Sequence, residues 1–216
     1  MKKSKAKITR PMPPEEALEF AEYGPMVPDA AVVDWIQREI VSENGSLHNP
    51  DHAHLENATL GVLWAGSGNE SKGRRVIGMA EIPRFLCNRW QKARQEQQIN
   101  DWFGFIPDFL ITLDAHYCAE GADDRSFAAL VEHELYHCGQ ATDEFGSPKF
   151  NQETGLPTWT IRGHDVEEFV GVVRRYGVGH PEGNLAQLVA AGNAQPEVAN
   201  ADISRACGTC LRAVSS

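Results

Sequence analysis

The chain has 216 residues, of which 42% are hydrophobic and 23% charged, and these proportions exclude a wholly disordered protein. With 30 acidic residues against 20 basic ones, the formal net charge is −10, so the surface repels phosphate backbones and nucleic acid is not an expected partner. No apolar run approaches the roughly 18 residues of a membrane span, so we expect no membrane partner. The five cysteines are an odd number, and we expect them as reduced thiols of a cytoplasmic protein.

Composition divides the chain into three parts. Residues 1–27 are rich in basic residues and proline, and we expect a mobile lead-in rather than a secretory signal, because no apolar stretch follows the basic start. Residues 28–189 carry regular patterns and are expected to form one domain. Residues 190–216 lack periodicity and are expected to form a loose tail, in which Cys207 and Cys210 are a lone C-x-x-C pair, interpreted as reduced thiols.

In chain order, the first half of the domain predicts a helix followed by two strands. Apolar residues recur at helical spacing from Asp29 to Val41, and Asp29 is a suitable N-cap after a proline. Segment 48–58 contains three histidines among turn-forming residues and is predicted as a polar loop. The runs 59–65 and 75–82 predict strands, and the polar connector between them indicates an antiparallel hairpin.

The second half predicts three helices and two strands. A polar helix is expected at 87–99, and the alternation of apolar and polar residues at 108–114 predicts a strand. The clearest helix is predicted at 124–140, followed by a short strand at 155–161 and a further helix at 164–176.

The predicted helix 124–140 contains the motif H-E-x-x-H as His133, Glu134 and His137. Residues four apart on a helix lie one turn above each other on the same face, so two imidazoles with this spacing can bind one Zn²⁺. Glu134 lies about 100° round the helix from His133, where its carboxylate can take a proton from a water on the metal. The sequence therefore predicts a zinc site in which Glu134 is the general base.

A catalytic zinc site needs a third protein ligand, and the sequence leaves more than one choice. We favour His164, which follows a turn at the start of the next predicted helix. Asp143 would give a spacing that resembles that of metzincins, without the glycine of their turn, and Glu167 or Glu168 would resemble the gluzincin arrangement. Asp165 is an alternative partner for the outer N–H of a ligating histidine.

The segments HELYH and HDVEEF together resemble zincin-like metallopeptidases, and more narrowly the SprT-like group and a set of phage metallopeptidases. The resemblance extends from about Val27 to His180. It implies an α+β, zincin-like fold in which a small, mainly antiparallel sheet packs on the active-site helix and on a second, ligand-bearing helix. It also implies zinc at His133, His137 and His164, with Glu134 as the catalytic base. SprT-like proteins commonly carry a four-cysteine zinc ribbon, which is absent here, so DNA binding is not expected.

These inferences lead us to expect a metallopeptidase with one Zn²⁺ per chain that acts on peptides or proteins in the cytoplasm, or in the host cytoplasm if the chain is phage-encoded. Two alternatives stay open. One is a DNA-associated, SprT-like protease, and the other is a non-catalytic binding protein stabilised by zinc on the same scaffold. The substrate and the oligomeric state are not predicted.

Overall fold

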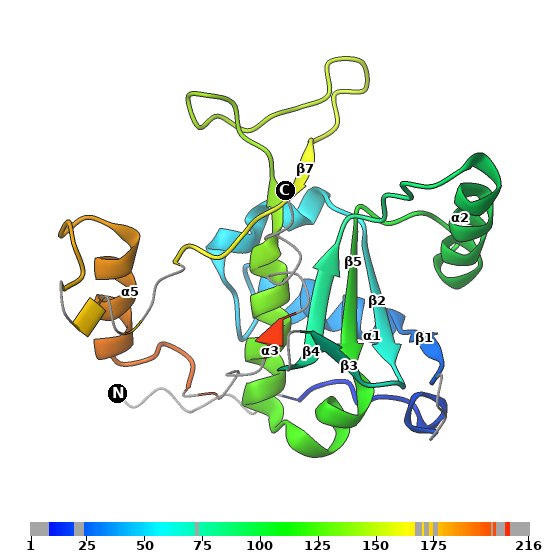
Figure 1. The fold of residues 1–216 in the computed structure, drawn as a ribbon, viewed down its shortest axis with the longest axis horizontal. Coiled ribbons are helices and arrows are strands. Elements are labelled where there is room, and N and C mark those ends of the chain that lie inside the picture. The colour runs from blue at the N-terminus through cyan, green and yellow to red at the C-terminus, as the bar shows by residue number, and fades with distance from the viewer. Residues whose placement is uncertain are drawn as a thin grey trace. The chain divides into compact units, whose positions relative to one another are not determined.

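The computed structural model describes residues 9–19, 24–71, 74–166, 170, 173–174, 177–199, 201 and 206–207 (Figure 1). The chain divides into two compact units, one of Met1–Arg162 with Ala201–Ser216, and one of Gly163–Asn200. Among the described residues, no helix combines the length and the apolar character needed to cross a membrane.

The first unit is an α+β structure built on a mixed sheet. Its path runs through β1 (Met26–Pro28), β2 (Leu60–Ala65), β5 (Phe109–Asp114), β4 (Arg74–Glu81) and β3 (Asn69–Ser71). The pairs β1–β2, β5–β4 and β4–β3 are antiparallel, whereas β2–β5 is parallel. A short strand, β8 (Ala206–Cys207), also pairs with β4 in the parallel direction.

The predicted hairpin of 59–65 with 75–82 is wrong, although both strands exist. In the structure β5 lies between β2 and β4, and β4 forms its hairpin with the short β3 instead. The physical reason is burial: β2 is buried along its whole length and β5 along nearly all of it, as expected for central strands covered on both faces. The expected mainly antiparallel sheet is therefore a mixed one, with a parallel pair near its centre.

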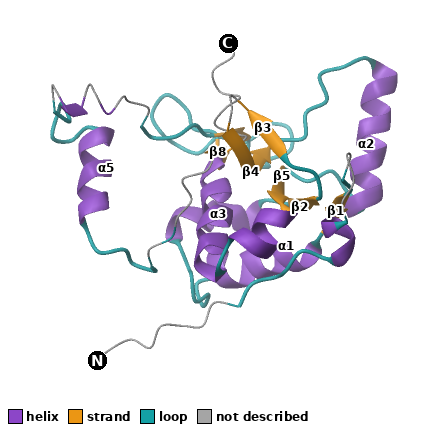
Figure 2. Ribbon diagram, turned by 60° about the horizontal axis from the view of Figure 1, so that its bottom comes forward, coloured by secondary structure: helices purple, strands orange, loops and turns teal. Residues whose placement is uncertain are grey.

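One face of the sheet is covered by α1 (Ala30–Ile36) and α3 (Asp124–His137), which Figure 2 shows together beneath the strands. Asp29 caps α1 by accepting a hydrogen bond from the Ala31 backbone N–H, and a π-helical turn continues the helix to Val41. The core between the layers includes Trp64 of the sheet, whose ring stacks on Phe127 of α3. The predicted helix at Asp29–Val41 is confirmed.

The opposite face carries α2 (Arg89–Phe103), which packs through Ile99 on Leu63 and Leu110. Asn88 begins this helix with a capping box, and Gly104 ends it in the left-handed conformation at φ 76°. The helix predicted at 87–99 is confirmed, with its start two residues later, at Arg89, and its end four residues later, at Phe103. The loop predicted at 48–58 is in fact a 3-10 helix over Pro50–Asn57, which begins after the Asn49 cap.

The helix α3 ends earlier than predicted. The chain turns to an extended conformation at Cys138, and Cys138–Gln140 forms β6, which pairs with β7 (Trp159–Ile161). The strand predicted at 155–161 is therefore confirmed only in its last residues. Between β6 and β7, segment 141–158 doubles back on itself through isolated bridges such as Thr142 with Pro148.

The second unit contains α5 (Asn184–Asn193), which was not predicted. The helix predicted at 164–176 lies largely outside the described residues, and so do the alternative ligands Glu167 and Glu168 and the tail cysteine Cys210. The domain limits at residues 28 and 189 stay a prediction.

Candidate metal centre

The helix α3 carries the H-E-x-x-H motif, and its local sequence explains why it forms there. Asp123 is the N-cap, and its carboxylate accepts a hydrogen bond from the Ser126 backbone N–H over 2.7 Å. An apolar stripe that includes Phe127, Val131 and Leu135 is fully buried against the sheet. The helix is thereby fixed in rotation as well as in position, so the direction of its motif residues is set by the core.

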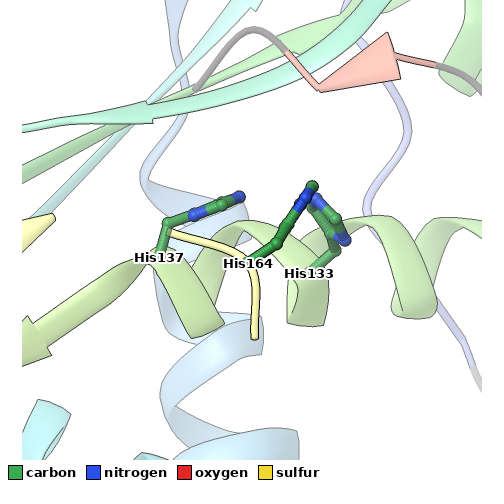
Figure 3. A group of neighbouring side chains, drawn as sticks. All are labelled: His133, His137 and His164. Atoms are coloured by element: carbon green, nitrogen blue, oxygen red, sulfur yellow. The ribbon is translucent and has the colours of Figure 1, made fainter. Parts of the chain in front are cut away.

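Three imidazoles converge at the C-terminal end of this helix (Figure 3). One ring nitrogen from each of His133, His137 and His164 lies within 4.8 Å of the others. The rings of His133 and His137 are 5.1 Å apart between centroids and nearly perpendicular, at 76°. His137 is buried, His133 is half-buried and His164 is exposed, so the group opens to solvent on the side of His164. Convergence of three imidazole nitrogens around one point is the arrangement in which histidines bind a divalent transition metal.

The ring of His137 is oriented by the strand that follows the loop. Its Nδ1 lies 2.6 Å from the Arg162 backbone carbonyl, and the Arg162 N–H donates to the His137 carbonyl over 2.9 Å. Because a carbonyl can only accept, Nδ1 is the protonated nitrogen and Nε2 is left with a lone pair for a metal. The same contact holds Arg162 beside the helix, two residues before His164. The β6–β7 pairing thus brings the chain back to the motif.

Glu134 is fully buried on the side of α3 that faces the sheet. Its nearest strand is β4, where a Cβ added to Gly78 would stand 2.5 Å from Glu134 Oε1 and 2.9 Å from Leu130 Cδ1. The carboxylate therefore occupies space that any other residue at position 78 would fill. Sequence reasoning missed Gly78 as a site position. The available signal was a glycine inside a predicted strand, which often marks a close approach.

The other candidate ligands are placed elsewhere or serve other contacts. The Asp143 carboxylate accepts hydrogen bonds from the backbone N–H groups of Phe145 and Ser147, so it closes a turn in the loop and is not in the three-histidine group. Asp165 is exposed, and its backbone carbonyl accepts a hydrogen bond from the Asn184 side chain.

The 3-10 helix at Pro50–Asn57 supports the back of α3 through a polar cluster. Asn49 Nδ2 donates to Glu132 Oε1 over 2.6 Å and to the Tyr136 hydroxyl over 2.9 Å, and that hydroxyl donates to Asp51. His52 is completely buried against the Tyr136 ring, and this burial lowers the pKa of His52 to about 4. The interpretation of this segment as polar loop residues is therefore wrong for His52, which is a neutral core residue.

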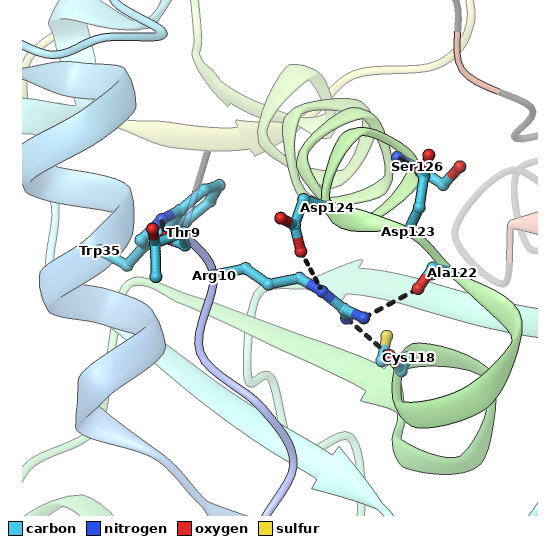
Figure 4. Close-up of polar contacts among 8 residues, drawn as sticks. All are labelled: Thr9, Arg10, Trp35, Cys118, Ala122, Asp123, Asp124 and Ser126. Atoms are coloured by element: carbon cyan, nitrogen blue, oxygen red, sulfur yellow. Dashed lines mark hydrogen bonds and ion pairs between the residues drawn. The ribbon is translucent and has the colours of Figure 1, made fainter. Parts of the chain in front are cut away.

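The start of α3 is held by a cation from the N-terminal region (Figure 4). The Arg10 guanidinium donates to the backbone carbonyls of Cys118 (2.5 Å) and Ala122 (2.8 Å) and pairs with Asp124 Oδ1 at 3.2 Å. It also lies 5.2 Å from the centroid of the Phe127 ring. This part of the expected mobile lead-in is anchored, because one buried cation donates to two backbone carbonyls and pairs with a carboxylate.

Comparison with protein families matches residues 33–193 to the family described as putative phage metallopeptidase. The chain belongs to this family. The match spans the three-histidine group and both sides of the β6–β7 loop, so the resemblance to phage metallopeptidases drawn from HELYH and HDVEEF is confirmed. Comparisons with curated proteins and with solved structures gave no match.

Proposed function

We propose that this phage metallopeptidase is a zinc-dependent enzyme that hydrolyses peptide bonds, with His133, His137 and His164 as the ligands and Glu134 as the general base. The observation that carries the proposal is the convergence of three imidazole nitrogens within 4.8 Å beside a buried glutamate of the same helix. Three imidazoles suit Zn²⁺ and leave a fourth position for the reaction, as in catalytic rather than structural zinc sites. The mixed sheet packed on this helix supports a zincin-like fold.

When bound, Zn²⁺ supplies a Lewis acid that polarises the scissile carbonyl and makes water acidic near neutral pH. The protein's own groups handle the protons. Glu134 accepts a proton from the attacking water and returns it to the leaving amine. Its burial on the sheet side of α3 keeps competing water away, and Gly78 leaves the space in which the carboxylate stands. The Arg162 carbonyl keeps His137 in the tautomer that offers Nε2.

The substrate is a peptide or protein segment in extended form. The strand nearest the proposed base is β4, which contacts α3. It pairs with β5 and otherwise, among the described residues, only with the short strands β3 and β8. An extended peptide that adds to this side of β4 would lie beside the metal, since main-chain hydrogen bonds align added strands with the sheet. The sequence of the preferred substrate and the cytoplasmic location stay predictions.

The decisive experiment separates metal binding from hydrolysis. Glu134→Gln should retain about one zinc per chain, measured by mass spectrometry of the metal, and should reduce casein hydrolysis by at least 10²-fold, about the contribution of a general base. His164→Ala should lose both the metal and the activity. Glu132→Gln is the matched control, because it changes a carboxylate of the same helix that lies outside the ligand group and leaves its Oε1 to accept from Asn49.

Two outcomes would contradict the proposal. Casein hydrolysis by Glu134→Gln at the wild-type rate would remove the role of the glutamate. A protein that binds no metal after dialysis against Zn²⁺ would remove the metal centre itself.

A further inference from the structure

One described strand near the C-terminus, β8, lies on the sheet beside the site. Figure 2 shows β8 next to β4, and the two strands pair in the parallel direction. Ala206 lies opposite Val76 and Cys207 opposite Gly78. Within the described residues, β8 comprises Ala206 and Cys207, so the described pairing covers two positions of β4. The contact joins segments that are far apart in the sequence and is not explained by a hairpin.

The paired stretch of β4 is the one that lies over the catalytic glutamate. Gly78 approaches Glu134 Oε1 so closely that a Cβ there would stand 2.5 Å away, and Leu130 of the same helix is the next contact. The residue of β4 that Cys207 faces across the pairing is therefore the residue that borders the proposed base. A peptide that pairs with this part of β4 needs the backbone groups that β8 already uses.

We propose that the C-terminal segment Ala206–Cys207 is a built-in competing strand, which occupies the substrate side of β4 until a longer peptide displaces it. This inference rests on the proposed peptidase function and adds its regulation. The described pairing covers two positions of β4, and an extended substrate that pairs over more positions gains more main-chain hydrogen bonds, so the exchange favours substrates that bind over several residues. The tail thus suppresses the hydrolysis of short or weakly bound peptides.

The kinetic consequence is specific. If the binding-competent form is only a fraction of the protein, the apparent affinity for substrate falls by that fraction, while the rate of the bound complex does not change.

Ala206→Pro in the full chain removes a backbone N–H and disfavours strand pairing. It should lower the KM for casein by about 10-fold and leave kcat unchanged. Val198→Pro is the matched control, because it places the same residue in an exposed segment outside β8 and should leave both constants as in the wild type.

A second measurement does not depend on a new proline. In the full-length Glu134→Gln variant, hydrogen exchange is followed in the peptides that contain residues 76–78 and 206–207. Saturating casein should speed exchange at 206–207 while 76–78 stay protected, because one strand replaces the other.

The outcomes separate the two proposals. If wild type and Ala206→Pro hydrolyse casein with the same KM, the proposal of a competing strand is overturned and the proposed peptidase function stands. Unchanged protection of 206–207 when casein is bound overturns it as well. Absence of hydrolysis in wild type and in both proline variants, each loaded with zinc, overturns the proposed function and the competing strand with it.

Discussion

Replacement of Gly78 by alanine tests whether the close approach of β4 to α3 positions Glu134, the proposed general base. The added Cβ would stand 2.5 Å from Glu134 Oε1 and 2.9 Å from Leu130 Cδ1, both far inside van der Waals contact, so at least one of these side chains must move. Overpacking of this kind costs about 1–3 kcal/mol in the free energy of unfolding. For a chain of this size, that corresponds to a fall in Tm of about 2–4 °C per kcal/mol.

The effect on activity should exceed the effect on stability. We expect Gly78→Ala to keep its zinc, since the three histidines are not touched, and to lose at least about 10²-fold in kcat/KM for casein, because a base displaced by about 1 Å loses its alignment. Urea unfolding, metal content and initial rates are measured on the same preparation.

Gly61→Ala is the matched control for this prediction. Its Cβ would crowd Pro107 and Phe103 at 3.0–3.1 Å, on the side of the sheet that carries α2, so it should destabilise the protein without affecting the site. A Gly78→Ala variant with wild-type kcat/KM, or a Gly61→Ala variant with an equal loss of activity, would refute the reasoning.

Three further predictions concern the surroundings of the site. Burial lowers the pKa of His52 to about 4 from an unfolded value near 6.5, so the unfolded state binds the proton first as the pH falls. The free energy of unfolding should therefore fall by up to about 3 kcal/mol between pH 6.5 and pH 4. Urea titrations over that range should show a smaller fall for His52→Phe. Arg10→Met should lower the free energy of unfolding in urea by about 2–3 kcal/mol, because two carbonyls and a carboxylate lose the donor that Arg10 provides. Arg38→Met, which removes an exposed ion pair, should lower it by less than about 0.5 kcal/mol. Equal losses in the two variants would contradict the anchoring role. Burial raises the pKa of the Cys118 thiol to about 12, so iodoacetamide should label the exposed Cys87 in the native protein and Cys118 only in urea, as peptide mass spectrometry would reveal.

Local patterns predicted the parts of the fold and site that depend on neighbouring residues. The helices at 29–41 and 87–99 and the strand at 108–114 follow from periodicity and caps within each segment. The spacing of His133 and His137 is likewise a property of one helix, so their alignment follows from the sequence alone.

Parts that depend on contacts between distant segments were not predictable in the same way. The order of β2, β5 and β4 is set by which buried strands share a layer, and adjacency in the chain suggested a hairpin that the structure does not contain. Only the packing of β4 on α3 shows that Gly78 borders Glu134. The burial of His52 depends on the position of Tyr136 in α3, far along the chain, which no local pattern encodes.

The two ends of segment 141–158 are held together by backbone contacts, and this has a consequence for protein engineering. The pairing of β6 with β7, together with the contacts between His137 and Arg162, closes the segment at its base, independently of what lies beyond. Inserts at its tip, near the turn that contains Gly146, should therefore lower the free energy of unfolding mainly through the entropy of closing a longer loop. This cost is about 0.6 kcal/mol for each doubling of loop length. The tip is thus a suitable point at which to graft an epitope or a recognition peptide, because the contacts at the base of the segment stay unchanged.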